Sequence, residues 1–229
     1  RQMCIRDSLY AVVFNRTTET DLTEDQLPQV DIYKYKQVIF VGDSRTEFME
    51  NVLTGMGESA TKNVKFVCSA GKGLDWFTTT GWAQLYSIVQ HDSNSILSKK
   101  TAVIFNFGVN DLSKSADYAE YYNWIAPQLK SKGCELYFMS VNPVNRLMLP
   151  NAGRADRSEA AVRSFNQYMK ANLSSAYTYI DMYSYLKSTG YSFASDHYGT
   201  GTVDDGLHYT TRTYKRIFAK CMDSLRVPA

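Results

Sequence analysis

One serine of the chain stands where a strand pattern changes into a helical pattern. Residues 38–52 read VIFVGDSRTEFMENV, and Ser44 follows the apolar run directly. Open parallel sheets bind ligands at the carboxyl ends of their strands, and the first turn of a helix directs backbone N–H groups toward an anion. Ser44 is therefore a candidate nucleophile. The alternative is that it caps the helix, which is the commoner role of serine at such a position.

A serine hydroxyl needs a neighbouring base, and the chain has three histidines that could supply it. His208 is preceded by Asp205, and a carboxylate three residues away on a turn can bond one ring nitrogen and leave the other to accept a proton. The alternatives are an Asp-Gly turn with an incidental histidine, or Asp204 as the orienting carboxylate. His91 lies in a polar segment and His197 in a predicted loop.

Two further segments could stabilise the negative charge that develops during acyl transfer. Asn110 follows the apolar run TAVIFNFG, and loss of a preorganised side-chain donor of this kind typically costs roughly 2.7–4 kcal/mol. Gly73 follows the second predicted strand and could bring a backbone N–H close to a ligand, with Gly71 as the alternative. Asn110 with Asp111 could instead form a turn or a cap, and the paired glycines could serve the loop alone.

The elements that must position these residues alternate between strand and helix patterns. Nearly continuous apolar runs predict strands covered by helices on both faces, which is typical of an α/β fold with a parallel sheet. Helical spacing of apolar residues begins after Ser44 and recurs in three later segments, and residues 182–209 are predicted to form a functional loop. The predicted strands are 38–42, 64–68, 102–107, 135–141 and 177–181, and the three later helical segments are 118–129, 162–173 and 214–225.

Length and composition indicate one domain without a nucleic-acid partner or a membrane span. The 229 residues include 25 Lys and Arg and 23 Asp and Glu, and the basic residues are scattered along the sequence. The longest apolar run, at 102–109, is far below the roughly 20 residues that span a bilayer. We predict an N-terminal arm or leader at 1–36, of which 1–8 are not native sequence, and a catalytic domain at 37–229.

The four cysteines are far apart in the sequence and form no CxxC pair, so they indicate buried or free thiols and no metal site. They leave the cellular compartment open. One location that agrees with the sequence is outside the cell or on its surface, in which case the targeting segment is missing from the sequence. The oligomeric state is open as well.

Taken together, the four segments resemble the SGNH/GDSL hydrolases, whose motifs occur in the same order. They read GDSR at 42–45, the glycine at 73, GVND at 108–111 and DGLH at 205–208, and the resemblance covers about 38–225. It implies a three-layer α/β/α sandwich with a five-stranded parallel sheet, which is a flavodoxin-like arrangement. Its position-by-position implications are a nucleophile at Ser44, a general base at His208 and an orienting carboxylate at Asp205.

The resemblance also implies an oxyanion hole formed by the backbone N–H groups of Ser44 and Gly73 and the side chain of Asn110, with no metal or organic cofactor. The sequence departs from the family at Arg45, which replaces the leucine of the nominal GDSL and is expected to change the groove beside the nucleophile. A second departure is Cys68, where relatives often carry a polar residue.

The expected substrate is a small-molecule or saccharide ester, and the leading expectation is deacetylation of a carbohydrate. Trp76 and Tyr198 are predicted to line a sugar-binding groove with Arg45, although aromatic side chains more often simply pack. Alternatives are a lipase or thioesterase acting on longer acyl chains, acyl transfer to another sugar, and a non-catalytic carbohydrate-binding module on a hydrolase scaffold.

Overall fold

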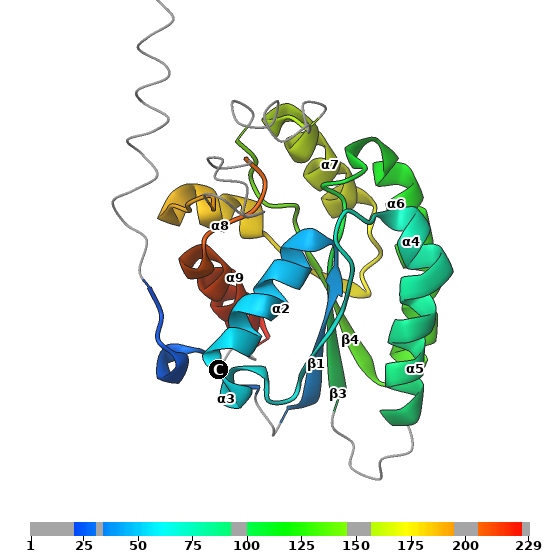
Figure 1. Ribbon diagram of the computed structural model, residues 1–229. Coiled ribbons are helices and arrows are strands. Elements are labelled where there is room, and N and C mark those ends of the chain that lie inside the picture. The colour runs from blue at the N-terminus through cyan, green and yellow to red at the C-terminus, as the bar shows by residue number, and fades with distance from the viewer. Residues whose placement is uncertain (1–20, 31–33, 93–99, 146–156, 195–205, 226–229) are drawn as a thin grey trace, which may run out of the picture.

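Five parallel strands form one sheet at the centre of the fold (Figure 1). The computed structural model describes residues 21–30, 34–92, 100–145, 157–194 and 206–225. The strands are arranged in the order β2-β1-β3-β4-β5. Their bounds are β1 Tyr35–Gly42, β2 Val64–Cys68, β3 Lys100–Asn106, β4 Cys134–Met139 and β5 Tyr177–Ile180.

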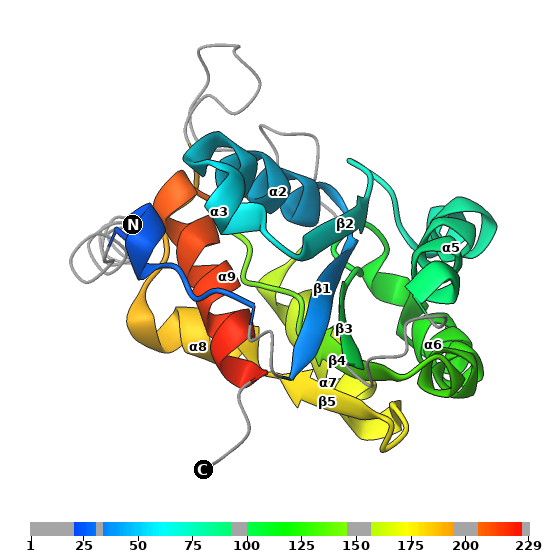
Figure 2. The ribbon, with the colours of Figure 1, turned by 90° about the horizontal axis from the view of Figure 1, so that it is seen from below.

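Helices cover both faces of the sheet and give the three layers that the resemblance implies (Figure 2). Alternate residues of β1 enter separate cores, with Phe40 in one and Ile39 in the other. The core around Phe40 is covered by α2 Ser44–Met56, α8 Met182–Thr189 and α9 Thr211–Ser224. The core around Ile39 is covered by α5 Trp82–Asp92, α6 Ser115–Ser131 and α7 Glu159–Asn172.

Short elements complete the described part of the chain. A 3-10 turn at Glu24–Gln26 belongs to the predicted N-terminal arm, whose Leu27 and Val30 are buried. The remaining short elements are α3 Glu58–Thr61, α4 Leu74–Trp76, the π-helical turn Phe77–Gly81 and the 3-10 turn Leu112–Lys114. None of the helices in the described ranges is long and apolar enough for a membrane crossing.

The predicted α/β class, the parallel sheet and all five strands are confirmed, with strand ends that differ by no more than a few residues. The prediction of a loop over residues 182–209 is wrong at its start, because Met182–Thr189 is a helix. Met182 and Leu186 are buried one turn apart, and Asp181 accepts the N–H of Ser184 as a cap. A helix of only two turns leaves too few apolar positions for a clear period.

The three cysteines of the described ranges agree with the prediction of buried or free thiols. Cys134 and Cys221 are buried, Cys68 is half-buried, and no disulfide joins them. Cys4 lies outside the described residues.

The strand order brings the candidate site to one edge of the sheet. The chain passes from β1 to β2 on one side and then to β3 on the other side of β1, so the order reverses beside the ends of β1 and β3. Ligands of open α/β sheets bind outside the carboxyl ends of the strands at such a point. The segments that leave these ends carry Ser44 and Asn110. Gly108 between β3 and Asn110 has φ +127°, which glycine adopts far more readily than other residues.

Candidate active site

The hydroxyl of Ser44 lies 2.8 Å from Nε2 of His208, although 164 residues separate the two in sequence. Ser44 begins α2 directly after β1, and His208 belongs to the turn that precedes α9. Their side chains are buried, with 5% and 1% exposure. A nucleophile and its base require a heavy-atom separation of about 2.6–3.2 Å, which this pair satisfies.

The N-terminal cap of α2 is Asp43, so the alternative role of Ser44 as the helix cap does not apply. The carboxylate of Asp43 accepts the backbone N–H of Arg45 at 3.0 Å. Asp43 is 1% exposed, and this burial raises the pKa of its carboxyl to about 6, against the lowering influence of the nearby Arg45 and Arg157 charges. The Ser44 hydroxyl is therefore left to His208.

The turn that carries His208 is held from three sides. The ring of Phe48, one helical turn after Ser44, contacts the imidazole edge-to-face with centroids 4.6 Å apart. The backbone N–H of Ala194 donates to the carbonyl of His208 at 2.9 Å, and the N–H of Asn145 donates to Gly206 at 2.8 Å. These contacts fix the imidazole relative to the nucleophile.

The side-chain amide of Asn110 is held by two hydrogen bonds. Its Oδ1 accepts from Nη2 of Arg157 at 2.5 Å, and its Nδ2 donates to the carbonyl of Lys72 at 2.7 Å. Arg157 is 2% exposed and also donates from Nε to the carbonyl of Val109 at 2.6 Å. One N–H of the amide then remains for a ligand, because an amide nitrogen carries two hydrogens. No motif in the sequence indicates that Arg157 holds the Asn110 amide.

Gly73 lies against the residue that follows Asn110. A Cβ added at Gly73 would come within 2.3 Å of Oδ2 of Asp111, so any larger residue would force the two segments apart. The same Oδ2 accepts the N–H of Leu74 at 2.9 Å, and Oδ1 accepts the hydroxyl of Tyr118 at 2.8 Å. Asp111 thus ties the Gly73 loop to the end of β3. Gly71, the alternative donor, is exposed.

Over residues 38–221 the chain matches the GDSL-like lipase/acylhydrolase family. The chain belongs to this family. It is accordingly an ester hydrolase of the GDSL type. Comparison of this GDSL-like hydrolase with curated proteins gives no match.

Solved structures share the fold of this GDSL-like hydrolase at low sequence identity. One is described as an SGNH hydrolase from Slackia heliotrinireducens, with 13% identity, TM-score 0.55 and coverage of 84% of this chain and 100% of that chain. An acetyl xylan esterase has 12% identity, TM-score 0.53 and coverage of 83% and 100%. An α/β hydrolase enzyme from the metagenome of Lake Arreo, Spain, has 11% identity, TM-score 0.53 and coverage of 85% and 98%. These values show a common fold.

Arg45, the residue by which this GDSL-like hydrolase departs from the nominal motif, points into the protein. Its guanidinium donates to the carbonyls of Leu207 at 2.9 Å, Asn142 at 2.9 Å and Pro143 at 2.8 Å, and it lies 5.1 Å from the ring centroid of Tyr209. With 3% exposure, this side chain is not available to a substrate. The expectation that Arg45 lines the groove is therefore corrected: it holds the turn beside His208.

The other expected site residues are only partly covered by the structure. Trp76 is half-buried on α4, with its ring centroid 6.0 Å from that of Phe107. Asp205 and Tyr198 lie outside the described residues, as do Asp204 and His197. Within the described ranges, no three His, Cys, Asp or Glu side chains are grouped so that they could hold a metal ion.

Proposed function

We propose that this GDSL-like hydrolase is a serine esterase with Ser44 as nucleophile and His208 as general base. The observation that carries the proposal is the 2.8 Å contact between the Ser44 hydroxyl and Nε2 of His208. Asp205 is proposed to orient the imidazole through its other nitrogen. Asp205 precedes His208 by three residues in the sequence, a spacing at which a carboxylate on a turn can bond the imidazole.

The proposed reaction has two steps, acylation of Ser44 and hydrolysis of the acyl-enzyme. The Ser44 oxygen attacks the ester carbonyl carbon while its proton passes to Nε2 of His208, and His208 returns that proton to the alcohol as the ester bond breaks. A water molecule then loses a proton to His208 and attacks the acyl-enzyme. The bond between the acyl carbon and the Ser44 oxygen then breaks, His208 returns the proton to that oxygen, and the carboxylic acid is released.

The negative charge of each tetrahedral intermediate is proposed to rest on three N–H donors. The N–H of Ser44 belongs to the first turn of α2 and has no partner within the helix. The second donor is the N–H of Gly73, and the third is the remaining N–H of Asn110. Because Arg157 and Lys72 hold the Asn110 amide before substrate arrives, this donor needs no reorganisation during the reaction.

The proposed substrate is a short-chain ester, with acetyl as the acyl group and a carbohydrate as the alcohol. An acetyl xylan esterase shares the fold, and Trp76 presents a half-buried indole three residues after Gly73. An aromatic side chain of this kind combines an apolar face with a polar N–H, which suits a sugar ring.

Replacement of Ser44 by Ala tests the proposal. Hydrolysis of 4-nitrophenyl acetate is expected to fall by at least about a thousandfold, because the nucleophile is lost. Ser131→Ala, a change at an exposed serine of α6, is the matched control and is expected to retain wild-type activity. Full activity in Ser44→Ala would contradict the proposed nucleophile. Preference for octanoyl over acetyl esters would overturn the short-chain assignment and leave the nucleophile intact.

A further inference from the structure

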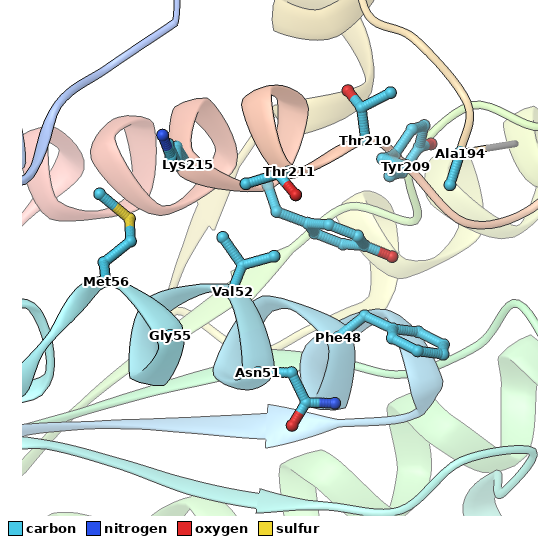
Figure 3. Close-up of a pocket in the computed structure, with 11 residues that line it drawn as sticks. Phe48, Asn51, Val52, Gly55, Met56, Ala194, Tyr209, Thr210, Thr211 and Lys215 are labelled. Atoms are coloured by element: carbon cyan, nitrogen blue, oxygen red, sulfur yellow. The ribbon is translucent and has the colours of Figure 1, made fainter.

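A groove with a volume of about 700 Å³ lies between α2 and α9 (Figure 3). The figure shows Val52 and Met56 of α2 on one side and Thr211 and Lys215 of α9 on the other. Protein sites for small molecules typically occupy about 300–1,000 Å³. An acetyl group of two carbons would fill only a small part of this space, so the groove is dimensioned for a larger portion of a ligand.

Three residues that line one end of the groove contact or adjoin the proposed base (Figure 3). Phe48, which lines the groove, contacts the imidazole of His208 with its ring edge at a centroid distance of 4.6 Å. Ala194, another lining residue, donates its N–H to the carbonyl of His208 at 2.9 Å, and Tyr209 follows His208 in the chain. Neither Ser44 nor His208 is among the described residues that line the groove, so a ligand in it would reach the reacting centre past the ring of Phe48.

The two walls of the groove differ in chemistry. Phe48, Val52 and Met56 are spaced four residues apart on α2 and form a half-buried apolar stripe. Thr211 and Lys215 are likewise four residues apart on α9 and offer a hydroxyl and an ammonium group, the latter paired with Asp21 at 3.0 Å. One wall thus suits an apolar surface and the other a hydroxyl-rich edge.

We propose that this groove binds the saccharide chain that carries the ester, which rests on the proposed esterase function. A sugar ring has an apolar C–H face and an edge of hydroxyl groups, so it can satisfy both walls at once. A fatty acyl chain would satisfy the α2 wall and would cover the Thr211 hydroxyl of the α9 wall without offering it a hydrogen bond, which is unfavourable.

Gly55 provides a way to fill the groove without disturbing the core. It lies on α2 between Val52 and Met56, and a Cβ added there would meet no atom within 4 Å. We expect Gly55→Trp to lower kcat/KM for an acetylated xylohexaose at least about tenfold more than it lowers kcat/KM for 4-nitrophenyl acetate. Ala83→Trp, at an exposed position of α5, is the matched control and is expected to leave both values unchanged.

Equal effects of Gly55→Trp on the two esters would overturn the proposal. A selective loss of 4-nitrophenyl octanoate hydrolysis would also overturn it, because the occupant would then be an acyl chain. Melting temperatures of both tryptophan variants are compared with that of the wild type, since a folding defect lowers activity on all esters together.

A binding measurement separates failure of the groove from failure of the esterase proposal. In the Ser44→Ala background, calorimetry with the acetylated xylohexaose is expected to show binding that Gly55→Trp weakens at least about tenfold. Absence of binding, or binding that is insensitive to the tryptophan, would refute the groove assignment. Absence of aryl acetate hydrolysis by the wild-type protein would instead refute the esterase proposal alone.

Discussion

Arg157 donates a hydrogen bond to Oδ1 of Asn110, and this contact fixes which end of the amide faces the site. Rotation of the amide by 180° would set its NH₂ group against the guanidinium and its oxygen against the carbonyl of Lys72, which now accepts from Nδ2 at 2.7 Å. Both contacts would become repulsive. The buried arginine therefore keeps the amide donor directed toward the proposed oxyanion hole.

Arg157→Met is expected to reduce kcat for 4-nitrophenyl acetate by about tenfold to a hundredfold with a smaller change in KM, because the donor acts mainly in the transition state. Arg157→Lys should restore part of the loss, since it retains a cationic donor. Steady-state kinetics on purified variants supply both constants.

The Asn110→Ala background distinguishes this positioning role from a general folding role. If Arg157 acts through Asn110, adding Arg157→Met to Asn110→Ala should change kcat by less than about twofold, since interacting residues are not additive. A loss of the same size in both backgrounds would rule out the positioning role.

Arg45→Leu restores the nominal leucine of the motif and tests whether Arg45 is structural. The change removes the guanidinium that donates to the carbonyls of Leu207, Asn142 and Pro143, of which Pro143 keeps a hydrogen bond from the Tyr209 hydroxyl, and loss of a hydrogen bond to a charged group costs about 1.5–3 kcal/mol. We expect the free energy of unfolding, measured by urea denaturation, to fall by about 3 kcal/mol or more. If the stability were unchanged and KM were altered, the original expectation that Arg45 lines the substrate groove would hold instead.

Asp205→Asn tests the proposed third member of the triad. Loss of the carboxylate that orients the imidazole is expected to lower kcat by up to about 10⁴-fold with the fold retained. Asp204→Asn is the matched control, because it removes the neighbouring carboxylate from the same segment. A larger loss in Asp204→Asn would transfer the orienting role to Asp204.

Asp43 is expected to make the protein less stable as pH rises from about 4 to about 6. Burial raises the pKa of its carboxyl from 3.8 to about 6, so in this interval the folded state binds more protons than the unfolded state. The stabilisation from the protonated form is complete below pH 3.8 and is lost as pH rises through about 6, with a magnitude on the order of 3 kcal/mol.

Asp43→Asn removes this titration and retains a residue that caps helices well. The difference in unfolding free energy, variant minus wild type, should therefore increase between pH 4 and pH 7. Other titrating groups largely cancel in the difference. A difference that stays flat with pH would contradict the raised pKa.

The strands were predictable because each is a short apolar run that helices cover on both faces. Ile39 and Phe40 illustrate the reason: neighbours in β1 are both fully buried in opposite cores, so the strand shows no polar alternation. The helix Met182–Thr189 was not predictable in the same way, since only Met182 and Leu186 mark its buried face.

The candidate nucleophile and base were recognisable from motifs, but the arginines that support them were not. Arg157 lies within RADRS, a polar segment typical of an exposed loop, and its buried position depends on the approach of residues 109 and 110. Arg45 receives its acceptors from segments about 100 and 160 residues away. Contacts made only in the folded chain leave no local pattern.

The 164-residue interval between Ser44 and His208 has a consequence during translation. At roughly 5–20 residues per second, the ribosome would add Ser44 to the chain about 10 to 30 seconds before it adds His208. Throughout that interval the nascent chain would carry Ser44 without its base. The proposed ester hydrolysis would therefore begin only after the sheet was complete and the turn that carries His208 had packed against Ser44.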